Sequence, residues 1–66
     1  MPRKIRQLIS DLVKAGFVNR GGKGNHRNFL HDESGAGLTL SGQMGADAKM
    51  YQEKDVKEAI RKATRQ

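Results

Sequence analysis

The N-terminal part of this 66-residue chain has an apolar spacing that matches only one kind of regular structure. Large apolar side chains recur at intervals of three and four residues, at Ile5, Leu8, Ile9, Leu12 and Val13. This period places them along one side of an α-helix, and such a helix must bury that side against another element. Pro2 suits the first turn of a helix, and Gly16 suits the left-handed position just after one. The sequence therefore predicts a helix over residues 2–15.

The same period returns near the C-terminus, at Val56, Ala59, Ile60 and Ala63. It predicts a second helix that begins at residue 51 or 52. Three short stretches between the helices, 17–20, 26–31 and 37–40, have the composition of β-strands. Residues 32–35, with the sequence DESG, have the composition of a turn.

The expected order is therefore α-β-β-β-α in a single domain, 1–66. Its simplest arrangement is a three-stranded antiparallel sheet with both helices packed on one face. We expect an α+β fold class, in which the other face of the sheet is open to solvent or to a partner.

Charge narrows the class of partner. Thirteen Lys and Arg against seven Asp and Glu give a formal charge of +6. Up to residue 31, seven basic side chains are accompanied by a single acidic one, Asp11. A surface of this sign attracts nucleic acid or an acidic protein. The alternative is a solvated surface that only keeps the protein soluble.

Other compositional features indicate the compartment. The chain has no cysteine, which fits a reducing environment. No apolar run approaches the roughly 20 residues needed to cross a bilayer, and the first residues do not resemble a secretory signal. We expect a cytoplasmic protein without membrane contact.

One segment, "GGKGNHRNF" at residues 21–29, combines glycines with a histidine. Side chains alternate along a strand, so Phe29, the expected core residue, shares a face with Arg27 and His31. His26 and Asn28 then point to the open face. The separation of the two histidines disfavours a paired-histidine mechanism and a metal site, and no HxH or HxxxH spacing occurs. No metal or other cofactor is expected.

An exposed imidazole can take and return a proton near neutral pH, as cleavage of the RNA backbone requires. The glycines at 21, 22 and 24 would admit a phosphate backbone and present N–H groups to it. Lys23 and Arg27 would contact the phosphates. The alternative is a polar residue after a flexible turn, because GGKG lacks the spacing of a nucleotide-binding P-loop.

Two longer segments resemble HicA toxins: "LISDLVKAGFV" followed by "GGKGNHRNFLH", and "LTLSGQMGADAKMYQEKDVKEAI". They occur in the family's order and span nearly the whole chain. The resemblance implies a fold similar to a double-stranded-RNA-binding domain. It also implies an mRNA interferase, a metal-independent endoribonuclease of a type II toxin–antitoxin system that inhibits translation and growth.

The family's catalytic histidine maps to His26, in "GNH". The residues expected by position to contact RNA are Gly22, Lys23, Gly24, Asn25, Arg27 and Asn28. The chain departs from the family's pattern at Asn25, where serine is frequent, and at Met50, where proline is frequent.

The partners implied are an mRNA substrate and a HicB-like antitoxin that covers the basic face and His26, with no DNA contact by this chain itself. The antitoxin's matching surface should be relatively acidic. One alternative is a non-catalytic module that reads double-stranded RNA by shape. A helix-turn-helix DNA binder fits less well, since three strand-like segments separate the two helices.

Overall fold

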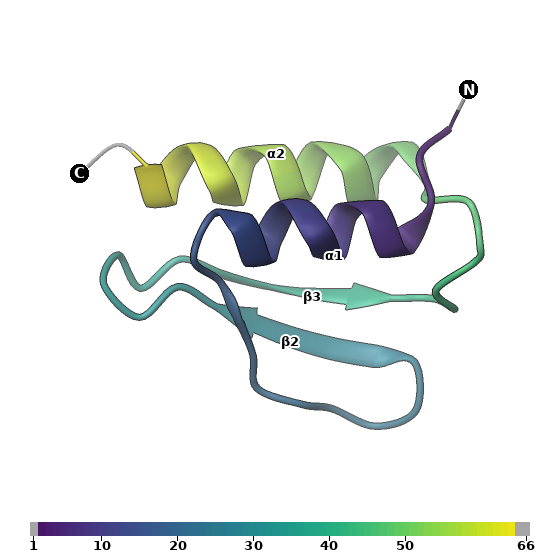
Figure 1. The fold of residues 1–66 in the computed structure, drawn as a ribbon, viewed down its shortest axis with the longest axis horizontal. Coiled ribbons are helices and arrows are strands. Elements are labelled where there is room, and N and C mark those ends of the chain that lie inside the picture. Colours follow the sequence, from purple (N-terminus) through teal and green to yellow (C-terminus); the bar gives the residue numbers. More distant parts are fainter. Residues whose placement is uncertain (1, 65–66) are drawn as a thin grey trace.

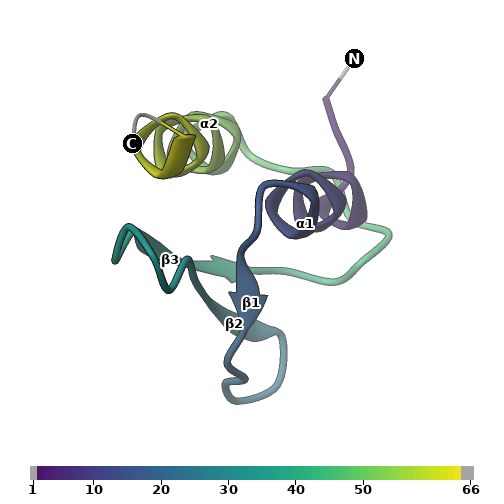
Figure 2. The same ribbon diagram turned by 60° about the vertical axis from the view of Figure 1, so that its left-hand side comes forward.

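The computed structural model describes residues 2–64 and has the predicted order of elements. These elements are α1 (Ile5–Lys14), β1 (Val18–Asn19), β2 (His26–Leu30), β3 (Gly37–Ser41) and α2 (Met50–Thr64). The strands form one antiparallel sheet in the order β1-β2-β3. Both helices lie on the same face of this sheet, as Figure 1 shows. In Figure 2, α2 lies over β3 while α1 lies nearer β1. The predicted α+β fold class is confirmed.

The core lies between the helices and the sheet. Its buried apolar side chains are Ile5, Leu8, Leu12, Phe17, Phe29, Leu40, Ala48, Val56, Ala59 and Ala63. Helix α2 contributes mainly alanines, whereas α1 and the sheet contribute the large side chains. Phe29 is only 2% exposed, so it points toward the helices as strand alternation predicts.

Helix α1 begins at Ile5, three residues later than the apolar spacing predicts. Residues 2–4 are not helical, and Lys4 forms an antiparallel β-bridge with Asp47. The N–H of Ile5 donates to the carbonyl of Ala46 at 2.9 Å. A loop carbonyl thus serves one of the N-terminal N–H groups that have no partner within a helix. Pro2 therefore lies before the helix and not in its first turn.

The buried face of α1 is narrower than the apolar spacing of the sequence predicts. Leu12 is fully buried and Ile9 is half-buried, but Val13 is 57% exposed. Ile9 and Val13 are one turn apart on the same flank of the helix. The sheet does not cover this flank completely, so the expectation that Val13 belongs to the core is wrong.

The end of α1 is a tight hydrogen-bonded turn that directs the chain into the sheet. Gly16 has a φ of +97°, the left-handed conformation expected just after the helix. The N–H of Gly16 donates to the carbonyl of Val13 at 3.0 Å, and that of Phe17 donates to Leu12 at 2.9 Å. These two bonds make a Schellman motif, which delivers the Phe17 side chain to the core.

Strand β1 is only two residues long, shorter than the predicted 17–20. Asn28 of β2 accepts from the N–H of Arg20 at 2.7 Å and donates to the carbonyl of Gly21 at 2.8 Å. Two residues therefore oppose one, as in a β-bulge, and the regular ladder ends there. The other elements differ from their predicted limits by one or two residues.

Candidate nucleic-acid interface

The loop before β2 folds back so closely that one of its positions has no room for a side chain. Gly22 has a φ of +155°, and a Cβ built on it would lie 2.0 Å from the carbonyl oxygen of His26. Glycine is required there because only glycine combines this φ with so close a backbone approach. The contact ties the conformation of the loop to the position of His26.

The tip of the loop is a four-residue turn from Lys23 to His26. The N–H of His26 donates to the carbonyl of Lys23 at 2.9 Å. Gly24 has a φ of +57° while Asn25 has a negative one, the pattern of a type II′ turn. All three residues from Lys23 to Asn25 are exposed. These three exposed residues immediately precede His26.

His26 is the first residue of β2 and is exposed on the sheet face opposite the helices. Directly across from it lies Ser41 of β3. The N–H of Gly42 donates to the carbonyl of Asn25, one residue outside this pair on each strand, at 3.2 Å. That pattern identifies a non-hydrogen-bonded pair, in which the opposing side chains come closest, with Cβ atoms about 4.5–5.5 Å apart. Within residues 2–64 the imidazole of His26 has no hydrogen bond or ion pair.

A second polar pair follows on the same face. Asn28 lies across from Thr39, and the Thr39 hydroxyl donates to the side-chain oxygen of Asn28 at 2.6 Å. Both side chains are exposed. The open face of the sheet therefore carries a polar quartet, which consists of His26, Asn28, Thr39 and Ser41.

Arg27 lies on the opposite face of β2 from His26 and is half-buried. Its Nη1 donates to the carbonyl of Gly42 at 2.7 Å and to that of Asn25 at 3.1 Å. The guanidinium therefore links the loop to the end of β3. It adds positive charge near the site, but it is not an unattached cation at the open face.

Gln52 fixes the end of β3 from the helix side. It is only 6% exposed, and its Nε2 donates to the carbonyl of Ser41 at 2.7 Å. Its Oε1 accepts from the N–H of Lys49 at 2.9 Å, which also caps the start of α2. Both polar ends of the buried amide are satisfied, so Ser41 is held firmly opposite His26.

The second histidine has a packing role. The His31 ring packs against Phe17 with their centroids 5.4 Å apart. Its Nδ1 lies 2.8 Å from the hydroxyl of Ser34 and accepts from the Ser34 N–H at 3.1 Å. His31 is therefore committed to the 31–34 turn. Across the described part of the chain no group of three His, Cys, Asp or Glu is placed to hold a metal ion.

The basic side chains near the loop differ in their partners, and Lys23 alone among Arg20, Lys23 and Arg27 has none between residues 2 and 64. Arg20 pairs with Asp32 at 2.8 Å, whereas no ion pair of Lys23 occurs between residues 2 and 64. Lys23 is therefore an exposed cation available to a phosphate beside His26.

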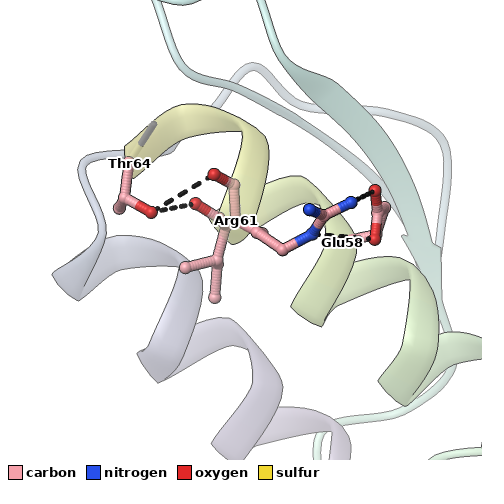
Figure 3. Close-up of polar contacts among 4 residues, drawn as sticks. Glu58, Arg61 and Thr64 are labelled. Carbon is pink, nitrogen blue, oxygen red and sulfur yellow. Dashed lines mark hydrogen bonds and ion pairs between the residues drawn. The ribbon is translucent and has the colours of Figure 1, made fainter. Parts of the chain in front are cut away.

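A further ion pair lies at the other end of the molecule, near the C-terminus of α2 (Figure 1). Figure 3 shows Arg61 against Glu58, with an Nη2–Oε1 distance of 2.5 Å. The hydrogen bonds that Arg61 donates to the Glu58 carboxylate, followed by the negative charge of Glu58, raise the pKa of Arg61 above its usual value. Thr64 donates to the carbonyl of Ile60 at 2.9 Å and completes this helix end. Exposed pairs of this kind contribute little to folding.

Three residues of the site were not anticipated from the sequence: Thr39, Ser41 and Gln52. Thr39 and Ser41 could have been found from the register of the β2–β3 hairpin, because a short turn restricts which residues of the two strands lie opposite each other. Gln52 gave no such signal, because its hydrogen-bond partner Ser41 is distant in sequence.

None of the helices in the described range is both long and apolar enough to span a membrane. Comparison of the chain with protein-family models, with curated proteins and with solved structures gave no match.

Proposed function

We propose that this chain is an endoribonuclease of the HicA kind, an mRNA interferase that acts in the cytoplasm and uses His26 to transfer protons. One observation carries the proposal: His26 is exposed on the open sheet face, unpaired within the described residues, where Gly22 packs against its carbonyl. Cleavage by attack of a ribose 2′-hydroxyl needs a base near that hydroxyl and an acid near the leaving oxygen. Positioned proton transfer of this kind contributes about 10²–10⁴-fold to a rate.

The surroundings of His26 suit a polyanion. Lys23 offers a cation at the tip of the loop, and Gly22, Gly24 and Asn25 expose backbone there. Asn28 lies two residues along the same face of β2. The formal charge of +6 draws RNA toward the molecule at long range. Arg27 adds its positive charge to this long-range attraction, while its guanidinium is bonded to the carbonyls of Asn25 and Gly42.

The proposed protein partner is a HicB-like antitoxin with an acidic surface. It would bind over the loop and the open face of the sheet, where it excludes RNA from His26. Complementary charge of this kind speeds encounter and selects the partner.

Cleavage of a defined RNA by wild type, His26→Ala and His31→Ala tests the proposal. His26→Ala should lose about 10²–10⁴-fold in rate without a change in melting temperature, because the His26 side chain has no partner among the described residues. His31→Ala is the matched control. It should melt earlier, because its ring packs on Phe17 and bonds to Ser34, yet it should still cleave.

Products should end in a 2′,3′-cyclic phosphate, and activity should persist in EDTA. Undiminished cleavage by His26→Ala would refute the assignment.

A second candidate is a non-catalytic module that binds double-stranded RNA. It is favoured by the same positive charge and by the α-β-β-β-α order. Such a module would form salt-dependent complexes with intact RNA, and His26→Ala would not alter the RNA recovered.

A further inference from the structure

The polar pair next to His26 on the open sheet face has unused hydrogen-bonding capacity. Thr39 commits its hydroxyl proton to the Asn28 side-chain oxygen at 2.6 Å, so its own oxygen can still accept. Asn28 keeps both N–H donors of its amide. Neither side chain has another partner within the residues that the structure describes. A free acceptor and a free donor therefore lie side by side and are exposed.

This combination is complementary to a hydroxyl group, because a hydroxyl both donates and accepts a hydrogen bond. A phosphate, by contrast, would use only the donors. The helices lie on one face of the sheet (Figure 2), and the side chains of the pair are exposed on the other. The 2′-hydroxyl of ribose is the group by which proteins distinguish RNA from DNA.

The spacing along β2 relates this pair to His26. Residues two apart on a strand share a face and are separated by about 6.6–6.8 Å. One extended nucleotide covers a distance of this order. If a bound RNA strand runs along β2 with its cleaved bond at His26, the ribose of a flanking nucleotide reaches Asn28 and Thr39.

We propose that Asn28 and Thr39 bind the ribose 2′-hydroxyl of a nucleotide that flanks the cleaved bond. The inference rests on the proposed ribonuclease function and adds a substrate-binding subsite to it. Recognition of RNA then depends on two ribose positions, the one whose 2′-hydroxyl attacks the phosphorus and its neighbour.

The test uses a short RNA whose cut has been mapped, together with versions that carry a single 2′-deoxynucleotide next to, but not at, the ribose whose 2′-hydroxyl attacks. For wild type, removal of the flanking hydroxyl should lower kcat/KM by about two- to tenfold, the usual worth of one neutral hydrogen bond. Thr39→Val keeps the side-chain shape and removes the acceptor, while the Asn28 donors remain, so the penalty for the flanking deoxynucleotide should be smaller than in wild type. Thr39→Ser should keep the wild-type penalty. Valine suits an exposed strand position, and melting curves verify that each variant is folded.

Three outcomes are possible. A flanking-deoxy penalty in wild type and Thr39→Ser that falls in Thr39→Val supports the subsite. Cleavage by wild type with no flanking penalty, or with the same penalty in Thr39→Val, overturns the subsite and leaves the ribonuclease function intact. Absence of any cleavage by wild type overturns both.

Discussion

The close approach of Gly22 to the His26 carbonyl predicts that a single added methyl group at position 22 destabilises the fold. In Gly22→Ala, the new Cβ would lie 2.0 Å from the carbonyl oxygen of His26 and 2.9 Å from the carbonyl carbon. These are backbone atoms, so no side-chain rotation relieves the overlap. The positive φ adds about 1–3 kcal/mol of backbone strain, and overpacking typically adds another 1–3 kcal/mol.

The expected loss of about 2–6 kcal/mol is large for a domain of this size, whose total stability is on the order of 3–10 kcal/mol. Each kcal/mol corresponds to about 4–8 °C in melting temperature for a small domain. Gly22→Ala should therefore melt at least about 8 °C below wild type. Relief of the overlap must also displace His26, so RNA cleavage by the fraction that remains folded should fall as well.

Two other glycines provide matched controls, measured by circular dichroism at a slow heating rate. Gly24 has a φ of +57° with nothing within 4 Å of an added Cβ, so Gly24→Ala reports backbone strain alone, about 1–2 kcal/mol. Gly45 has open space and no positive φ, so Gly45→Ala should be neutral or slightly stabilising. The reasoning is refuted if Gly22→Ala melts at or above Gly24→Ala.

Two further predictions concern the core and the buried amide. Leu12→Ala should lower the free energy of unfolding by about 2–5 kcal/mol, because Leu12 is fully buried. The exposed Val13 is the control: Val13→Ala should change the free energy of unfolding by less than about 0.5 kcal/mol in urea titrations. Comparable losses in the two variants would contradict the placement of α1. Gln52→Glu should lower the free energy of unfolding by about 1–3 kcal/mol at pH 7, because a carboxylate cannot donate a hydrogen bond to the carbonyl of Ser41. Part of this stability should be regained at pH 4, where the protonated acid can donate. Equal stability of this variant at the two pH values would show that the hydrogen bond to Ser41 is unimportant.

Strand alternation alone anticipated the central feature of the site. It placed Phe29 in the core and His26 on the opposite face, because neighbouring side chains on a strand must diverge. The left-handed conformation of Gly16 was also predictable, because it follows from a glycine placed directly after the last apolar residues of a helix. The predictions that were wrong concerned features that depend on contacts between parts of the chain far apart in sequence. Helix α1 starts late because Lys4 bridges to Asp47, and Val13 is exposed because of where the sheet ends.

The bridge between Lys4 and Asp47 also has a consequence for how the protein is made. Its side chains form an ion pair of 2.5 Å across 43 positions of sequence, and the N–H of Ile5 depends on Ala46 in the same loop. Helix α1 is therefore synthesised before the loop at residues 46–47 that supplies its N-terminal partners. Such long-range closure follows local steps in folding. A growing chain thus carries a first helix with an incomplete N-terminus until residues 46 and 47 have been made.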